Sequence, residues 1–174
     1  MRRLVTLLLV CLAMPLCMSA QTAQDFASRF MEDNLDDKNL ECVTVGPKML
    51  REITKLAKEY DKQDVMSFFS NINSVRIINS GSSAEEYRKE ALELLESSGK
   101  RYTKYGKGDS SEDYGDCVWV RRRSDKIVEF VYVSMAKEKE FMVLDITGQL
   151  DEDFVDSLLN NSKKHKFFHF NTCI

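Results

Sequence analysis

The sequence has few of the residues that catalysis most often requires. It contains two histidines, His165 and His169, and both lie in the C-terminal tail. No G-x-S-x-G motif is present, and no Ser-His-Asp or Cys-His set is suggested outside that tail. Hydrolysis by a nucleophile with a histidine base is therefore not indicated. A hydrolase that uses carboxylates alone remains an alternative, because two carboxylates distant in sequence can meet in space.

The sequence also lacks a recognisable metal or phosphate motif. His165, His169 and Cys173 are spaced to share one face of a helix, but the surrounding phenylalanines favour extended structure. The acidic loop 109–116 does not have the glycine and final glutamate of an EF-hand in place. The glycines at 106–108 are too closely spaced for a phosphate loop. We therefore expect no cofactor and no metal.

A basic excess is missing as well. The chain has 25 Lys and Arg against 28 Asp and Glu, a net charge of −3. Because phosphate binding requires a basic surface, no nucleic-acid partner is expected. Beyond the first 20 residues, no apolar run is long enough to cross a bilayer, so we expect no transmembrane segment in the mature chain.

Residues 1–20 have the layout of a secretory signal peptide. Two arginines precede an apolar run over residues 4–17, and small residues follow before position 21. We expect cleavage after Ala20 and an extracytoplasmic protein, periplasmic or secreted; a retained membrane anchor is the alternative. Leu16 before Cys17 is larger than a lipoprotein signal requires, so a lipid anchor is not expected.

Three cysteines remain outside this segment: Cys42, Cys117 and Cys173. The number is odd, so one disulfide with a free thiol and three buried thiols are both open. If a disulfide forms, the pairs to test are Cys117–Cys173 and Cys42–Cys117.

The rest of the chain alternates helical and strand patterns. Helices are expected from Thr22 (as cap), from Pro47, from a Ser83–Glu86 capping box and after Asp151. Strands are expected at 40–45, 74–79 and 101–105, followed by three within 117–150. In the second helix, Met49, Ile53, Leu56 and Tyr60 recur at helical spacing. With the flanking Leu50 and Ala57 they predict a buried stripe.

These patterns predict an α+β fold. We expect a largely antiparallel sheet with a C-terminal three-stranded meander and helices packed mainly on one face. The domain would span residues 21–162, between the signal peptide and a basic-aromatic tail over 163–174.

The meander offers a candidate binding surface. A turn at Arg123–Lys126 and an even-length loop at 136–139 would sort the side chains into an aliphatic face and an aromatic face. Trp, Tyr and Arg dominate binding hot spots, so the aromatic face is the candidate site. An odd-length turn would break the sorting, and a helix or the Phe-rich tail covering this face as core is the alternative. The candidate residues are Trp119, Arg121, Arg123, Phe130, Tyr132 and Phe141.

The order of several motifs resembles the DUF4252 family, small exported proteins of unknown function mainly from Bacteroidetes. The motifs are VTVGPKML, SVRIINS before a charged helix, and FMVLDITGQLDEDFVDSL, and the resemblance covers about residues 24–160. It implies an exported α+β domain and brings no catalytic residues.

We therefore expect an exported, non-catalytic binding or accessory protein of the cell envelope, with an envelope protein or a small ligand as partner. Two alternatives remain open. One is a small envelope hydrolase that uses carboxylates, and the other is a structural partner that adds to the sheet edge of another envelope protein.

Overall fold

A computed structural model describes residues 24–60, 66, 68–106, 116–135 and 140–165, and for 160–165 the backbone alone. The predicted signal peptide and the tail beyond His165 lie outside these residues. The elements are α2 (Phe26–Asp33), β1 (Glu41–Val45), α3 (Pro47–Glu59), β2 (Ile72–Ser80), α5 (Ala84–Ser97), the 3-10 turn η2 (Gly99–Arg101), β3 (Thr103–Lys104), β4 (Cys117–Arg123), β5 (Lys126–Met135), β6 (Phe141–Leu150) and α6 (Glu152–His165).

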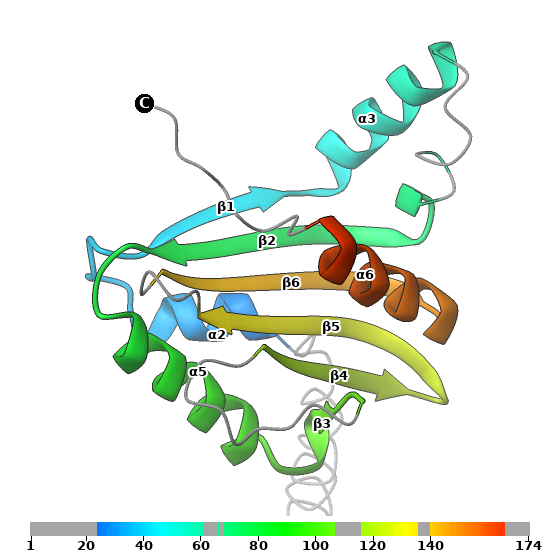
Figure 1. Cartoon of the computed structure of the whole chain (residues 1–174). Coiled ribbons are helices and arrows are strands. Elements are labelled where there is room, and N and C mark those ends of the chain that lie inside the picture. Colours follow the sequence, from blue (N-terminus) through cyan, green and yellow to red (C-terminus); the bar gives the residue numbers. More distant parts are fainter. Residues whose placement is uncertain (1–23, 61–65, 67, 107–115, 136–139, 166–174) are drawn as a thin grey trace, which may run out of the picture.

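The strands form one six-stranded sheet in the order β1-β2-β6-β5-β4-β3, and each neighbouring pair is antiparallel. The α+β class and the β4-β5-β6 meander predicted from the sequence are confirmed. Strand β6, the last in the chain, lies in the middle of the sheet between β2 and β5 (Figure 1).

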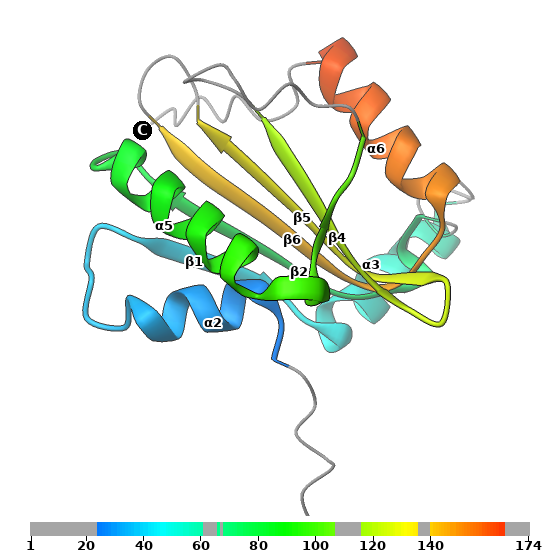
Figure 2. The same ribbon diagram turned by 90° about the horizontal axis from the view of Figure 1, so that it is seen from below.

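Helices cover both faces of this sheet. Helices α2 and α5 pack on one face, around Phe26, Phe30 and Leu95, and α6 packs on the other through Val155 (Figure 2). Each face has its own cluster of buried side chains, so the sheet is the middle of three layers.

The first hairpin of the meander has the predicted turn but not the predicted register. Ser124 and Asp125 have φ values of 50° and 64°, as a two-residue hairpin turn requires, and Arg122 pairs with Ile127 as expected. A bulge then shifts the register by one residue, so that Val120 pairs with Phe130. Successive side chains point to opposite faces of the sheet. A shift of one residue therefore places each side chain of β5 beside β4 side chains from which the prediction had separated it.

The second hairpin is also displaced by one residue from the prediction. Met135 pairs with Phe141, which leaves the odd-length loop 136–140, and Tyr132 pairs with Leu144 instead of Val143. The predicted sorting of the meander into an aliphatic and an aromatic face is therefore wrong.

Two helix starts also differ from the sequence pattern. Helix α2 begins at Phe26 with Asp25 as its cap, whose carboxylate accepts from the Ser28 amide at 2.8 Å. Thr22, the predicted cap, lies outside the described residues. Helix α5 does begin after Ser83, but Ser83 has φ 50° and makes no side-chain cap bond, so the predicted capping box does not form.

Helix α3 departs most from expectation. Three of the residues predicted to be buried are open to solvent: Met49 and Leu56 are each 53% exposed and Tyr60 is 73% exposed. Ile53 is half-buried, and the flanking Leu50 and Ala57 are buried as predicted. The reason is that α3 projects beyond the sheet from the end of β1, so that its apolar arc contacts the body along one edge (Figure 1).

The cysteines in the described part of the chain are thiols. Cys42 lies on β1 and Cys117 on β4, four strand positions away, which is about 19 Å at the usual strand spacing. A disulfide needs Cα atoms within about 7 Å, so the Cys42–Cys117 pair is excluded. Cys173 lies outside the described residues.

Candidate functional site

The six residues of the predicted aromatic face do not share a surface. Trp119 and Phe141 are buried under α2 and α5, whereas Phe130 and Tyr132 are buried on the opposite face. The one-residue shifts in both hairpins separate them.

The two arginines of the predicted face also have different surroundings. Arg121 donates through Nε to the buried carboxylate of Glu129 at 2.5 Å, and Arg123 is exposed at the hairpin turn. They do not edge a common binding face.

The burial of Trp119 gives a direct optical test. Trp119 is the single tryptophan and is 5% exposed. We expect blue-shifted emission that acrylamide does not quench in the native state, and a red shift with quenching in urea. Emission near that of free tryptophan in the folded chain would contradict this placement.

Two buried carboxylates lie under the N-terminus of α2. Glu129 on β5 is fully buried, and its Oε1 accepts from the Phe26 amide at 2.7 Å and from the Tyr102 hydroxyl at 2.8 Å. Its Oε2 accepts from Arg121, so both oxygens are bonded. A buried carboxylate is stable only with such partners. Glu129 therefore links the start of α2 and the Arg121 side chain of β4 to strand β5.

Asp145 on β6 is the second of these carboxylates and has fewer partners. Its Oδ2 accepts from the Ala27 amide at 2.8 Å, while Oδ1 has no hydrogen-bond partner among the described residues. Burial raises the pKa of Asp145 well above its ordinary value, and the charge of Glu129 raises it further. Folding therefore favours the protonated form of this carboxyl.

Together these contacts fill the N-terminus of α2. The amides of Phe26, Ala27 and Ser28 donate to Glu129, Asp145 and Asp25, and Arg76 contacts Asp25 and the Ser28 hydroxyl. The first amides of a helix attract anions, and here the protein's own carboxylates occupy that position. The arrangement is a structural anchor with no amide left for a ligand.

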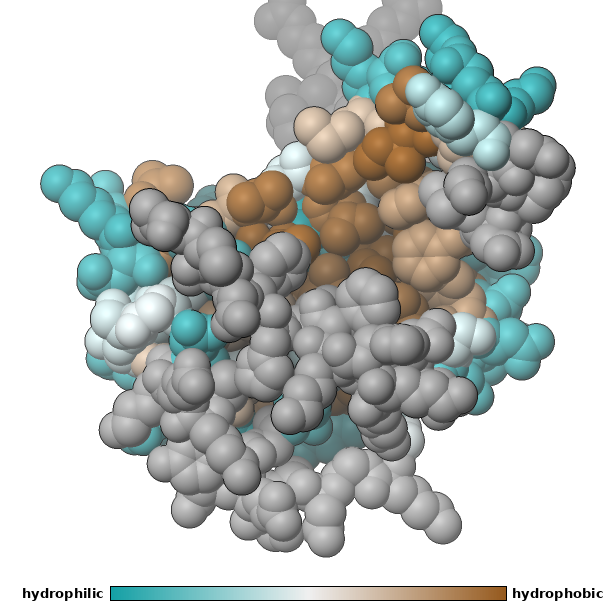
Figure 3. Space-filling model, turned by 45° about the horizontal axis from the view of Figure 1, so that its top comes forward, coloured by the Kyte–Doolittle hydropathy of each residue, from teal (hydrophilic) through white to brown (hydrophobic). Residues whose placement is uncertain are grey.

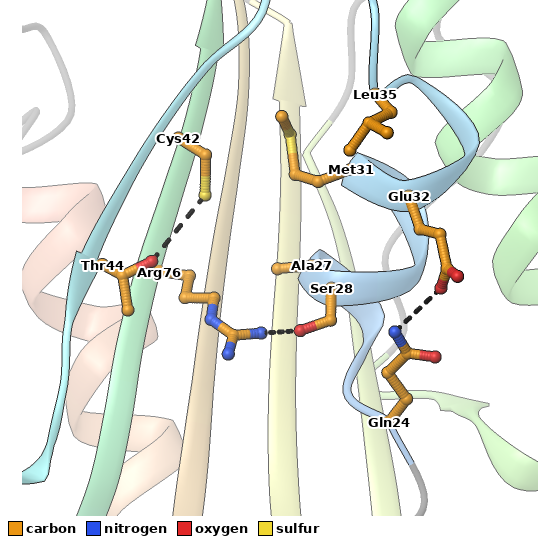
Figure 4. A pocket seen from close by; sticks show the side chains of 9 residues that line it. All are labelled: Gln24, Ala27, Ser28, Met31, Glu32, Leu35, Cys42, Thr44 and Arg76. Carbon is orange, nitrogen blue, oxygen red and sulfur yellow. Dashed lines mark hydrogen bonds between the residues drawn. The ribbon is translucent and has the colours of Figure 1, made fainter.

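Beside this anchor, a shallow hollow of about 490 Å³ lies between α2 and β1 (Figure 4). Arg76 points across it toward Ser28, and Cys42 lies 4.0 Å from the Thr44 hydroxyl. The polar groups drawn there already have partners within the chain. The lining residues are Gln24, Ala27, Ser28, Met31, Glu32, Leu35, Cys42, Thr44 and Arg76.

Several exposed apolar side chains gather on the opposite side of the sheet (Figure 3). We call this group the α3 face: the exposed side chains of Val43, Met49, Leu56, Tyr60 and Phe68. Figure 3 shows apolar side chains gathered there in a hollowed patch that continues from the projecting helix toward the sheet. Contiguous apolar patches of this kind mark interaction sites in soluble proteins.

Half-buried side chains form the floor of the α3 face. The floor consists of Val45 on β1 and of Val75 and Ile77 on β2, which pack against the same cluster as α6. Their neighbours along each strand point to the opposite face of the sheet, toward α2. In the first turn of α6, Phe154 lies 5.0 Å from Phe68, ring centre to ring centre. The α3 face is therefore a continuation of the core that none of the described helices covers.

Three acids border this surface. Glu41 lies on the same side of β1 as Val43, two residues away, and is exposed. Glu52 and Glu59 are exposed on α3, and the helical spacing places them directly beside the edge formed by Met49 and Leu56. The charges next to the apolar floor are therefore acidic, and the exposed Lys48 and Lys55 follow on the outer side of Glu52 and Glu59.

The sequence over residues 30–158 matches the model of a family described as a domain of unknown function, DUF4252. The chain belongs to this family. No curated protein and no solved structure matches the chain. The DUF4252 match includes Glu129 and Asp145 but begins after the α2 amides that these carboxylates bind.

Sequence reasoning missed both anchoring carboxylates of this DUF4252 domain. The available signal was a lone acid within an apolar strand, as in KIVEFVYV and FMVLDITG. The sequence pattern did indicate the apolar stripe of α3, but we interpreted that stripe as part of the core. Among the described residues of the DUF4252 chain, no His, Cys, Asp and Glu cluster suits a metal, and no helix is long and apolar enough to span a membrane.

Proposed function

We propose that this chain is an exported, non-catalytic binding or accessory protein of the cell envelope, and that the α3 face is its binding surface. The observation that supports the proposal is the exposed apolar stripe of α3. An amphipathic helix normally buries such a stripe, and leaving it in water costs stability. The layout of residues 1–20 supports export.

The chemistry of the α3 face defines the partner we propose. The floor is apolar, the charges next to it are Glu41, Glu52 and Glu59, and Lys48 and Lys55 lie further out on α3. An amphipathic segment of another envelope protein with aromatic or aliphatic side chains on one side and lysines or arginines beside them would satisfy both features. Recognition would follow the helix-in-groove mode, in which buried apolar anchors supply affinity and flanking charges supply selectivity.

A peptide titration tests this proposal. The probe is a fluorescein-labelled, twelve-residue amphipathic peptide with leucine and phenylalanine on one side and lysine on the other; a second peptide has glutamate in place of lysine. We expect the lysine peptide to bind the mature chain, residues 21–174, more tightly than the glutamate peptide in fluorescence anisotropy. Intact mass of the exported protein checks the cleavage near Ala20.

Two leucine variants locate the binding. Leu56→Glu places a charge on the α3 face, and Leu35→Glu places the same charge on an exposed leucine beside the hollow next to α2. Leu56→Glu is expected to weaken binding of the lysine peptide about tenfold or more, the effect of roughly 1.4 kcal/mol. Equal affinity of both variants, or no preference for the lysine peptide, would overturn the proposal.

A further inference from the structure

We propose that two copies of this chain pair through β1, the outermost strand of the sheet, about a twofold axis at Val43. Helix α3 of each copy then lies over β1 and β2 of the other copy. The pairing stands on its own evidence, and one consequence for partner binding, given below, rests on the proposed function.

The outer edge of β1 pairs with none of the described strands. Strand β1 stands at the end of the sheet order, and its residues Glu41 to Thr44 are exposed. Natural sheets protect such an edge with prolines, bulges or several charges. Strand β1 has Glu41 as its single charge, contains no proline, and pairs with β2 in one continuous register. The outward N–H and C=O groups of alternate residues are therefore open to another strand.

The sequence of β1, ECVTV, suits antiparallel pairing with itself. When the axis passes through Val43, all five residues have a partner in the second copy. Val43 then faces Val43, Glu41 faces Val45, and Cys42 faces Thr44. Registers centred on Cys42 or Thr44 pair fewer residues. Because the axis is perpendicular to the sheet, the α3 faces of both copies lie on the same side of one continuous sheet.

Helix α3 projects to the side on which the second copy lies. In Figure 1, β1 is the upper edge of the sheet and α3 extends beyond it, away from β2. Figure 3 turns this edge forward and shows the apolar patch on the same side. In the pair, the exposed stripe of Met49, Leu56 and Tyr60 lies over β1 and β2 of the other copy. There Val43 is 55% exposed, and Ile77 is half-buried on the same face.

The strand pair and the helix are needed together. A two-stranded pair of five residues is marginal in water, and a stable interface buries about 800 Å² on each partner. Tyr60 is largely exposed, and a covered tyrosine buries about 150–250 Å². Met49 and Leu56 are half-exposed on the same stripe. The stripe of α3 therefore adds apolar area that the strand pair lacks.

The charges favour this pairing. Glu41 of one copy comes opposite Val45 of the other, directly before α3 starts at Pro47. No described side chain caps that helix, and its first amides and the exposed Lys48 attract a carboxylate. Within one copy, Glu41 and Pro47 are at opposite ends of β1, so this contact forms only between copies.

Like charges are kept apart in the same arrangement. The two Glu41 residues lie on opposite sides of the axis, about 14 Å apart along the paired strands. This separation exceeds the Debye length of about 8 Å at physiological salt, so their repulsion is largely screened.

Pairing also governs access to the α3 face, and this consequence rests on the proposed function. A copy whose stripe is covered by the second copy is closed to an external segment. The partner and the second copy therefore compete, and the apparent affinity for the partner falls as the concentration of the chain rises.

Sedimentation equilibrium of the mature chain, residues 21–174, tests the pairing. We expect a mean mass that rises with concentration from one chain toward two. Val43→Glu and Val43→Lys each place like charges opposite one another at the axis, and each is expected to weaken dimerisation about tenfold or more. An equimolar mixture of the two variants should dimerise more tightly than either alone, because opposite charges then face each other. A parent mass of one chain over the whole concentration range, or no recovery in the mixture, would overturn the proposal.

A variant at the other edge of the sheet is the matched control. Thr103→Glu places the same charge on an exposed residue of β3 and should leave dimerisation unchanged. A loss of dimerisation as large as that of Val43→Glu would contradict the β1 edge as the contact.

Cross-linking checks the axis directly. Val43→Cys is made in a chain with Cys42→Ser, Cys117→Ala and Cys173→Ser. It should give a disulfide-linked dimer on mild oxidation, because directly paired strand residues have Cα atoms about 4.5–5.5 Å apart. Thr103→Cys in the same chain should give little. Equal cross-linking of the two would overturn the proposal.

The lysine peptide separates this inference from the proposed function. The peptide is expected to shift the dimer toward single chains, and the glutamate peptide is not. If the parent stays monomeric but binds the lysine peptide with sensitivity to Leu56→Glu, the pairing fails and the proposed function stands. If the parent dimerises and responds to the Val43 variants but binds neither peptide even when diluted to single chains, the proposed function fails and the pairing stands. A dimer that binds the lysine peptide without losing mass would overturn the placing of α3 in the interface.

Discussion

Glu129→Ala is expected to destabilise the domain by about 3–5 kcal/mol, the cost of removing one partner from a buried charged pair. The substitution leaves the Phe26 amide, the Tyr102 hydroxyl and the Arg121 guanidinium without their common acceptor. Because Glu129 is fully buried, water does not replace it without opening the core. Urea unfolding followed by Trp119 emission measures the change.

Two variants define the size of this effect. Tyr102→Phe removes one of the three donors to Glu129 and is expected to cost about 1 kcal/mol. Glu90→Ala on the exposed side of α5 serves as the matched control, with a change within about 0.5 kcal/mol. If Glu129→Ala were no more damaging than Glu90→Ala, α2 would not depend on the buried carboxylate.

Asp145→Asn is expected to remove a component of the pH dependence of stability. The pKa of Asp145 is raised in the folded chain by burial and by Glu129, so between its unfolded value near 4 and its folded value the native state holds more protons than the unfolded state. Raising the pH through that window therefore lowers the free energy of unfolding, by at most about 1.4 kcal/mol per pH unit for one group.

The asparagine variant retains an oxygen that can accept from the Ala27 amide but does not titrate. We expect the difference in stability, variant minus parent, to grow in favour of the variant from about pH 4 upward and to level off above the folded pKa. Asp125→Asn, at the exposed turn of the β4–β5 hairpin, is the control. Parallel stability curves for the parent and Asp145→Asn would contradict the raised pKa.

The sequence was sufficient for the elements and the class of the fold. The strands of the meander are rich in β-branched and aromatic residues, and Gly99, which has φ 62°, marks the end of α5 as a glycine after a helix does. These are local signals, and local signals determine where helices and strands form.

The registers could not be obtained in the same way. A bulge near Arg122 and the five-residue loop before Phe141 each move the pairing by one residue, and a single residue exchanges the faces of a strand. Trp119 and Tyr132, placed together by the sequence, are therefore on opposite faces. In the observed register Val131 and Val133 join the buried cluster that contains residues of α2 and α5, which are distant parts of the chain.

The candidate site was missed for a related reason. The apolar stripe of α3 was visible in the sequence, but the periodicity of a helix shows that one side is apolar and not what covers it. Helix α3 leaves the sheet at Gly46, and its direction there keeps Met49 and Leu56 away from the core. The direction of an element after a turn is a property of the assembled fold.

The central position of β6 also determines when the domain can fold during synthesis. Until residues 141–150 have emerged from the ribosome, β2 and β5 each lack the neighbour that joins the two halves of the sheet. The anchor of α2 is delayed as well, because the Ala27 amide waits for Asp145, 118 residues later. Contacts of such long range make folding late and slow. A nascent chain of this topology stays open until most of its length has been made, and it exposes two bare strand edges to chaperones in the meantime.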